Sequence, residues 1–206
     1  MLNVDGFILA GGASRRMGTD KCNLILEGQT SLDHVANAML PACRRVTVVG
    51  RELDHPTLKS TPDIHSTWGA LGGLHAALTS CESDWALIVA CDMPYVTTSL
   101  FERLISFAAD FDAVAPIQAD LTPQPLCSLY RKAACLTFAE ALIKSGERKP
   151  ITLLQSVRTR WVMFKELTDL VAANLFFENL NTPEDLSRAK SRGNVFATED
   201  ERTTLR

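Results

Sequence analysis

A glycine-rich loop near the start of the chain holds the first residues whose types and spacing could do chemistry. The apolar run Val4–Ala10 ends in Gly11 and Gly12, and the cations Arg16 and Lys21 follow shortly afterwards. Glycines let a polyphosphate approach backbone N–H groups closely, and Arg and Lys neutralise its charge. The loop therefore indicates a polyphosphate site, although a plain turn between a strand and a helix on a basic surface would also contain a glycine pair.

A carboxylate directly follows the most apolar run of the chain. Asp92 comes after Ala86–Cys91, which is typical of a parallel strand buried on both faces. Ligands of open α/β sheets bind outside the carboxyl ends of the strands, and Mg²⁺ is usually held by one or two carboxylates together with substrate oxygens. Asp92 is thus a candidate Mg²⁺ ligand, with capping of the turn at Pro94 as the structural alternative.

Two further groups of polar residues have both a functional and a structural interpretation. Asp63 precedes the glycine-containing run Gly69–Gly73, and its carboxylate could accept hydrogen bonds from the N1–H and 2-amino groups of guanine. By itself the position of Asp63 favours an acid in a surface loop. The amides of Asn179 and Asn181 can both donate and accept hydrogen bonds, which suits a heterocyclic ring or a metal-bound water, whereas Thr182 explains the same segment as a helix cap.

Strands alternate with helices along the chain, and this order must position those residues. The expected strands are Val4–Ala10, Val46–Val49, Ala86–Cys91, Asp112–Pro116, Leu126–Tyr130 and Arg160–Phe164. The expected helices are Ser31–Arg44, Ala70–Ser80, a helix capped by Thr98 or Ser99 that runs to Ala109, Lys132–Lys144 and one that follows Thr182. This alternation predicts an α/β fold, a single Rossmann-like three-layer domain with a mostly parallel central sheet. We expect the domain to span residues 1–190 and a polar, loose tail to span 191–206.

Composition excludes several classes of partner. A chain of 206 residues fits one domain, and its net charge of −3 argues against nucleic acid and anionic membranes as partners. No stretch reaches the roughly 18 apolar residues of a membrane span. The six cysteines include no C-x-x-C pair, and no signal peptide is recognisable, so we expect a cytoplasmic protein with reduced thiols.

The string from Leu9 to Lys21, LAGGASRRMGTDK, resembles the signature loop of the molybdenum cofactor guanylyltransferases, the MobA family of nucleotidyltransferases. The resemblance extends to about Lys190 through four more strings, which are Pro62-Asp63 with Gly69–Leu74, Cys91–Pro94, Pro123–Leu126 and Asn179–Leu186. Two positions depart from the family's pattern. Ala70 stands where the family often has Pro, and Gly50 follows the second strand, where it often has Asn.

The resemblance implies an activity and a set of site residues. The family transfers GMP from GTP to the terminal phosphate of molybdenum-molybdopterin, which gives the guanine dinucleotide cofactor and pyrophosphate, with Mg²⁺ as cofactor. It implies cofactor-delivery proteins and molybdoenzymes as further partners. Catalytic roles are implied for Arg16, Lys21 and Asp92, metal binding for Asp92, nucleotide binding for Leu9, Ala10, Gly11, Gly12, Lys21, Asp63 and Asp92, and acceptor binding for Asn179 and Asn181.

Three alternatives stay open at the level of sequence. A sister nucleotidyltransferase that uses CTP, or that acts on a sugar phosphate or another phosphorylated acceptor, would share the fold and the glycine loop. A dinucleotide-dependent oxidoreductase predicts G-x-G-x-x-G after the first strand, and this motif is missing. A non-catalytic carrier of the cofactor would be expected to lack Lys21 or Asp92, and both are present.

Overall fold

The computed structural model describes residues 2–11, 21–65 and 68–192. The strands are β1 (Val4–Leu9), β2 (Ile25–Leu26), β3 (Gln29–Thr30), β4 (Val46–Val49), β5 (Lys59–Thr61), β6 (Trp85–Ala90), β7 (Ala113–Ile117), β8 (Cys127–Arg131) and β9 (Thr159–Met163). The α-helices are α1 (Ser31–Met39), α2 (Gly69–Ser80), α3 (Thr98–Ser106), α4 (Lys132–Lys144), α5 (Pro150–Ser156) and α6 (Pro183–Ser191). Short 3₁₀ turns are η1 (Lys21–Asn23), η2 (Phe164–Glu166) and η3 (Ala173–Leu175). Across these residues, no helix combines the length and apolar character that crossing a membrane requires.

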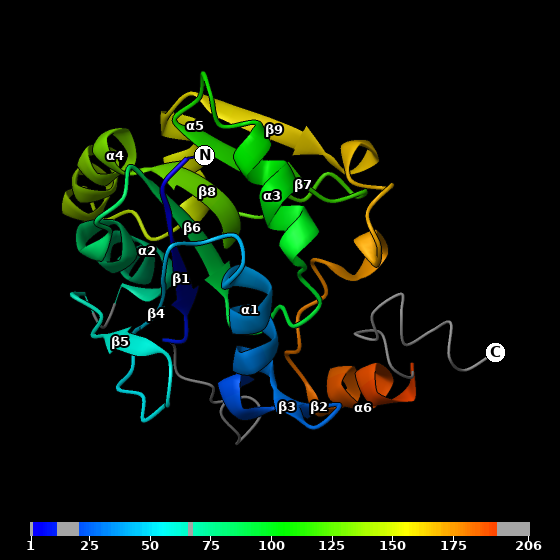
Figure 1. Ribbon diagram of the computed structural model, residues 1–206. Helices are drawn as coiled ribbons and strands as arrows, with labels where there is room; N and C mark the ends of the chain where they lie inside the picture. The colour runs from blue at the N-terminus through cyan, green and yellow to red at the C-terminus, as the bar shows by residue number, and fades with distance from the viewer. Residues whose placement is uncertain (1, 12–20, 66–67, 193–206) are drawn as a thin grey trace.

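Seven strands form one central sheet in the order β5-β4-β1-β6-β8-β7-β9 (Figure 1). The pairs β4–β5, β1–β4, β1–β6 and β7–β9 are parallel, whereas β8 runs antiparallel to both of its neighbours. The first four strands therefore have the order of a Rossmann half-sheet, in which the chain moves outward from β1 and then returns to its other side. The predicted fold class, an α/β domain with a mostly parallel sheet, is confirmed.

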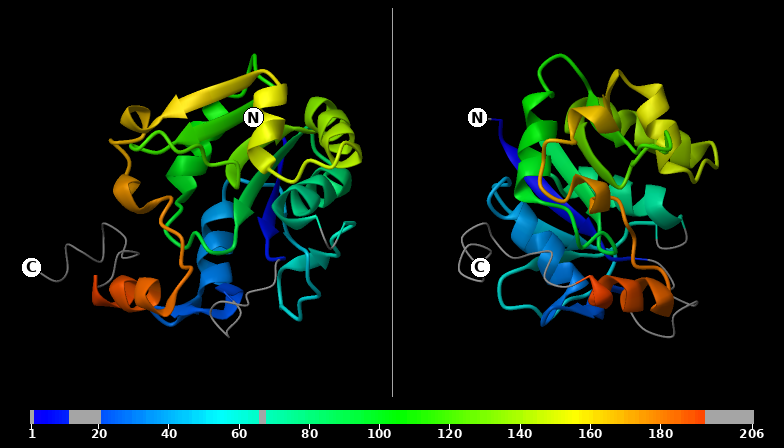
Figure 2. Two further views of the ribbon diagram at one scale, coloured as in Figure 1. Left: turned by 180° about the vertical axis from the view of Figure 1, so that it is seen from behind. Right: turned by 90° about the vertical axis from the view of Figure 1, so that its right-hand side faces the viewer.

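Helices cover both faces of the sheet, as the right-hand view of Figure 2 shows. Helices α1 and α3 pack on one face against a core that includes Leu87 and Val89 of β6. Helices α2, α4 and α5 pack on the other face against Ala86 and Ile88 of the same strand. Strand β6 is consequently buried on both sides along its whole length, as its continuous apolar run predicted. Burial on both faces keeps the carboxyl end of β6, which Asp92 follows, in a fixed position.

The boundaries of two predicted helices were wrong for identifiable reasons. The helix expected over Ser31–Arg44 ends at Met39. Pro41 has no N–H to donate to the preceding turn, so the chain leaves the helix there. Helix α3 is capped by Thr97, whose side chain accepts the Leu100 N–H at 3.3 Å, rather than by Thr98 or Ser99. It ends at Ser106 and not at Ala109, since the C-cap residue Phe107 has left the helical conformation.

The last helix begins as predicted. The Thr182 side chain accepts the Asp185 N–H at 3.1 Å, and the Asp185 carboxylate accepts the Thr182 N–H at 2.9 Å, which forms a capping box. Helix α6 lies beside the hairpin of β2 and β3, and a small apolar cluster that includes Leu26 and Leu180 joins them (Figure 1). The expected loose tail falls almost entirely outside the described residues, so the division into residues 1–190 and 191–206 stays a prediction.

A buried carboxylate near the start of β1, at the end of the strand away from the glycine loop, joins β1 to the turn before β6. Asp5 is fully buried and accepts hydrogen bonds from the Glu82 N–H, the Ser83 N–H and the Ser83 hydroxyl at 2.8, 3.1 and 2.8 Å. Arg45 forms an ion pair with it at 3.0 Å. Burial raises the pKa of Asp5, but these hydrogen bonds and the charge of Arg45 outweigh it, so the pKa lies below its ordinary value.

We expect Asp5→Ala to lower the free energy of unfolding at pH 7 by about 3 kcal/mol, because it leaves the buried donors without an acceptor. Urea denaturation followed by circular dichroism measures this loss. A carboxyl whose pKa is lowered by folding stabilises the protein above its unfolded pKa of about 3.9 and loses that effect as the pH falls through the folded value. The difference from wild type should therefore shrink below about pH 4. The exposed Asp54→Ala is the control and should change stability by less than about 0.5 kcal/mol.

Candidate functional site

A cavity lined by described residues lies where the order of the strands reverses. The chain passes from β1 outward to β4 and β5 and then returns to β6 on the other side of β1. Such a switch point leaves a crevice outside the carboxyl ends of the two central strands. A cavity of about 310 Å³ occupies this position. Its wall includes Leu9, Ala10 and Gly11 after β1, and Ala90, Cys91 and Asp92 after β6.

Two glycines touch beneath one edge of this cavity. Gly50, directly after β4, has a φ of +96°, and a Cβ there would lie 2.8 Å from Gly11 Cα and 2.9 Å from Gly11 N. Glycine is thus required at position 50 both for its backbone conformation and for the close approach of the glycine loop. The sequence showed only that this position departs from the family pattern, and the contact explains why a glycine stands there.

Three segments far apart in the sequence meet at one end of the cavity. The ammonium of Lys21, in η1, forms an ion pair with the Asp92 carboxylate at 3.2 Å and donates a hydrogen bond to the side-chain oxygen of Asn181. The Leu180 N–H donates to the Asp92 carbonyl at 2.9 Å, which ties the segment before α6 to the end of β6. The Lys21 and Asp92 side chains keep 29% and 16% of their surface exposed, so both groups remain accessible to a ligand.

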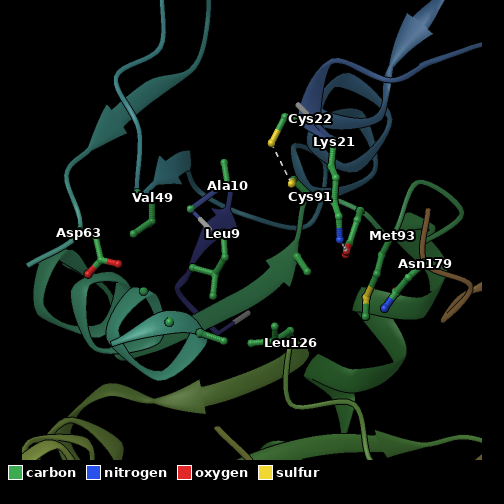
Figure 3. A pocket seen from close by; sticks show the side chains of 17 residues that line it. Leu9, Ala10, Lys21, Cys22, Val49, Asp63, Cys91, Met93, Leu126 and Asn179 are labelled. Carbon is green, nitrogen blue, oxygen red and sulfur yellow. Dashed lines mark hydrogen bonds and ion pairs between the residues drawn. The ribbon is translucent and has the colours of Figure 1, made fainter. Parts of the chain in front are cut away.

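Asp63 lies on the other side of the same cavity. Figure 3 shows it separated from Lys21 by Leu9 and Ala10, while all four residues line the cavity. One Asp63 carboxylate oxygen accepts the His65 N–H at 2.9 Å, and a Cβ on Gly72 of α2 would come within 3.4 Å of it. This turn fixes the direction of the Asp63 carboxylate before any ligand binds.

The Asp63 loop is held by an anchor that sequence reasoning missed. The Trp68 indole N–H donates to the Glu147 carbonyl at 2.8 Å, and the Arg148 guanidinium lies 4.8 Å from the centre of the Trp68 ring. A Cβ on Gly72 would approach Trp68 Cβ to 2.8 Å, so α2 packs tightly beneath this turn. A lone Trp and an Arg far along the chain gave no signal that they would meet.

Asn179 brings an acceptor into the cavity that has no partner in the described part of the protein. Its side-chain oxygen is buried and accepts no hydrogen bond there, although the residue lines the cavity beside Met93 (Figure 3). A buried acceptor without a donor is costly. This oxygen is therefore a candidate acceptor for a polar ligand, a water or a cation at this end of the cavity.

The structure brings most of the predicted site residues together. Those that line the cavity are Leu9, Ala10, Gly11, Lys21, Asp63, Asp92 and Asn179. Asn181 does not line it but contacts Lys21. Gly12 and Arg16 lie outside the described residues. Within the described ranges no group of three or more His, Cys, Asp or Glu side chains forms a ready-made metal site.

Comparison with known proteins decides the family. A family model described as the MobA-like NTP transferase domain matches residues 6–159, which include the glycine loop, Asp63 and Asp92. The chain belongs to this family. A relative from Pelotomaculum thermopropionicum, named probable molybdenum cofactor guanylyltransferase, is 32% identical over 193 residues that cover 92% of this chain and 93% of the relative.

Two further matches support membership of the MobA-like family. The molybdenum cofactor guanylyltransferase of Desulfosudis oleivorans is 31% identical over 91% of this chain and 95% of its own length. The crystal structure of molybdopterin-guanine dinucleotide biosynthesis protein A from Archaeoglobus fulgidus superposes with a TM-score of 0.77, at 26% identity, over 91% of this chain and 97% of that one. The fold is therefore that of a known family of nucleotidyltransferases.

We expect Gly50→Ala to weaken the binding of a nucleoside triphosphate about tenfold, because the new Cβ must push Gly11 out of the cavity wall. Titration calorimetry with GTP and Mg²⁺ measures this change. Gly146→Ala is a matched control, since Gly146 also has a positive φ, +88°, but a Cβ there would meet nothing within 4 Å. The positive φ should cost each variant about 1–2 kcal/mol of stability. Gly50→Ala should lose more than this because of the clash with Gly11, and only Gly50→Ala should lose affinity. Equal binding by the two variants would show that the contact between Gly50 and Gly11 does not shape the site.

Proposed function

We propose that this protein transfers the GMP moiety of GTP to the terminal phosphate of molybdenum-bound molybdopterin, with release of pyrophosphate. Full-length relatives that carry the name molybdenum cofactor guanylyltransferase support this assignment. The observation that carries it is the pairing of Lys21 with Asp92 at the switch-point cavity, opposite Asp63. Such a cavity offers charged groups to a triphosphate at one end and a carboxylate to a base at the other.

The two ends of the cavity define the orientation of the nucleotide in this proposal. The Asp63 carboxylate accepts hydrogen bonds from N1–H and the 2-amino group of guanine, a pair of donors that cytosine and adenine lack. The triphosphate extends past Leu9, Ala10 and Gly11 to Lys21. The first turn of α2 lies at the Asp63 end, and its N-cap residue Trp68 makes no side-chain capping bond, so backbone N–H groups there are available to acceptor atoms of the base.

The reaction requires no covalent intermediate with the protein. An oxygen of the acceptor phosphate attacks the α-phosphorus of GTP, and the bond from that phosphorus to the bridging oxygen of pyrophosphate breaks. The nucleophile is already an anion, so no general base is needed. The protein's contribution is to hold two anions in line and to neutralise charge on the leaving pyrophosphate. We assign this neutralisation to Lys21 and Arg16.

A divalent cation fits the residues that line this end of the cavity. Asp92 supplies one carboxylate, and Asn179 supplies a buried oxygen that lacks a partner in the described residues. Mg²⁺ characteristically takes one or two protein oxygens and completes its shell with phosphate oxygens and water, so these two oxygens are sufficient as its protein ligands. When bound, the cation neutralises phosphate charge that develops as pyrophosphate leaves.

The acceptor is assigned to the segment before α6. Asn179 and Asn181 lie on either side of Leu180, whose N–H is bonded to the Asp92 carbonyl, so both amides stay beside the phosphate end of the cavity. Their side chains can donate to pterin oxygens and accept from pterin N–H groups. A cytoplasmic location, cofactor-delivery proteins and molybdoenzymes as partners remain predictions from the sequence.

The nucleotide preference tests the proposal. Purified protein with molybdenum-loaded molybdopterin and Mg²⁺ should release pyrophosphate fastest with GTP, and mass spectrometry should detect the guanine dinucleotide product. Omission of the acceptor is the control and should stop pyrophosphate release. Turnover with CTP equal to or above that with GTP would replace the assignment with cytidylyl transfer.

The role of Asp63 has a separate readout. Inosine triphosphate keeps N1–H but lacks the 2-amino group, so wild type should prefer GTP to it by about tenfold, the value of one hydrogen bond to a charged group. Asp63→Ala should abolish this preference while leaving the reaction with inosine triphosphate detectable. If the ratio of the rate with GTP to the rate with inosine triphosphate is unchanged in Asp63→Ala, the carboxylate does not recognise the base.

A further inference from the structure

Two cysteines meet inside the wall of the cavity. The Sγ atoms of Cys22 and Cys91 are 2.8 Å apart, and the two residues are only 1% and 7% exposed (Figure 3). Both line the cavity. Each is the direct chain neighbour of a proposed active-site group, Cys22 of Lys21 and Cys91 of Asp92. All six cysteines lie in the described part of the chain, and none forms a disulfide.

The other four cysteines stand in a different environment. None of them lines the cavity as described. Burial raises the pKa of the Cys43 thiol to about 12, that of Cys81 to about 11, and those of Cys127 and Cys135 to about 12. A raised pKa disfavours the reactive thiolate. The Cys22–Cys91 pair differs from these four in its geometry, because both of its residues line the cavity and its sulfur atoms lie 2.8 Å apart. Cys43 is informative as a control because it is partly exposed and still disfavoured as a thiolate.

We propose that Cys22 and Cys91 are a site of oxidation, at which a peroxide that enters the cavity converts the two thiols into a disulfide and thereby slows nucleotidyl transfer. The S–S bond of a disulfide is about 2.05 Å long, so the two sulfur atoms need to approach by less than an ångström. The effect on transfer rests on the proposed function. The oxidation itself rests only on the geometry of the pair.

The chemistry balances with hydrogen peroxide as the oxidant. The Cys91 sulfur attacks one peroxide oxygen and breaks the O–O bond, which gives a sulfenic acid, and the thiol proton leaves with the released hydroxide as water. The Cys22 sulfur then attacks the sulfenic sulfur, and its proton leaves with the second hydroxide as another water. In total the two thiols lose two electrons and two protons, and one peroxide becomes two molecules of water.

The disulfide would restrict the movement of Lys21 and Asp92, which need to separate during the reaction. In the described structure Lys21 is paired with Asp92, whereas the proposed reaction needs Lys21 on phosphate and Asp92 on a cation. A covalent bond between the neighbouring residues links η1 to the end of β6 and restricts this exchange. A displacement of about 1 Å in such a site can change a rate by about a hundredfold, so we expect transfer to fall at least about tenfold on oxidation.

The test uses the full-length protein in reduced form and hydrogen peroxide as the probe. Digestion without reductant, followed by mass spectrometry, should find a peptide pair joined through Cys22 and Cys91, lighter by two hydrogen atoms than the separate peptides. Guanylyl transfer should fall at least about tenfold and return after treatment with dithiothreitol. GTP with Mg²⁺ in the cavity should slow formation of the linked pair.

Matched variants separate this pair from the other thiols. In Cys22→Ala and in Cys91→Ala, the rate of transfer should be the same before and after peroxide treatment. Circular dichroism confirms that both variants fold. Cys43→Ala should still be slowed by peroxide treatment. Absence of the linked peptide in protein that transfers GMP would overturn the oxidation site, and a linked protein with an unchanged rate would overturn its effect on transfer. If the reduced protein transfers no nucleotide at all, the proposed function fails, and the linked peptide alone still decides the oxidation site.

Discussion

Asp92→Asn is expected to lower the rate of guanylyl transfer by about a thousandfold, which corresponds to about 4 kcal/mol of transition-state stabilisation. The carboxylate stands at the end of β6, a strand buried on both faces, and its main-chain oxygen is fixed by the Leu180 N–H. The substitution keeps the size of the side chain and its capacity to accept from Lys21. It removes the negative charge that would attract a divalent cation to the phosphate end of the cavity.

The dependence of the rate on Mg²⁺ concentration distinguishes this role from a structural one. Asp92→Asn should need far more Mg²⁺ to reach its own maximal rate, while its melting temperature stays within a few degrees of wild type. Asp169→Asn is the control, because it removes a carboxylate from an ion pair with Arg103 that does not line the cavity. An Asp92→Asn variant with the wild-type rate and metal dependence would remove Asp92 from the site.

Lys21→Ala should lower the rate of transfer by about a hundredfold and weaken GTP binding, because it removes the cation closest to Asp92 among the described residues. Its effect on folding should be small. The ion pair with Asp92 is partly exposed, and pairs of this kind contribute at most about 1 kcal/mol. The expected signature is therefore a large loss of activity with a nearly unchanged melting temperature.

The competing interpretation makes the opposite prediction. If Lys21 only joins η1 to the end of β6 and to Asn181, Lys21→Ala should lower the melting temperature and keep the activity. Lys165→Ala is a matched control, since Lys165 is exposed on η2 and does not line the cavity. Stopped-flow measurements of GTP binding, made together with thermal melts, would decide between the two interpretations.

The parts of this fold that were predictable from the sequence have strong local signals. The apolar run that ends at Cys91 predicted a buried strand and placed Asp92 at its carboxyl end, where the structure has it. The Thr182 cap set the start of α6. The resemblance of the motifs brought Lys21, Asp63 and Asn179 into one hypothesis, and all three line the cavity.

What could not be predicted depends on contacts between distant segments. Strand β5 is a short, largely exposed edge strand without an apolar pattern, so it gave no signal. The antiparallel direction of β8 follows from how the chain crosses the sheet and not from the composition of the strand. The requirement for glycine at position 50 arises from Gly11, far away in the sequence. The meeting of Cys22 with Cys91 likewise needs the folded sheet.

The bond between the Leu180 N–H and the Asp92 carbonyl also affects the order in which the site is built during synthesis. Strands β1 and β6 leave the ribosome early, but Asn179 and Asn181 follow only after most of the chain has been made. Domains fold as units, so the contacts of Leu180 with Asp92 and of Asn181 with Lys21 form only after these late residues have left the ribosome. The cavity is therefore incomplete in any nascent chain that lacks the segment before α6.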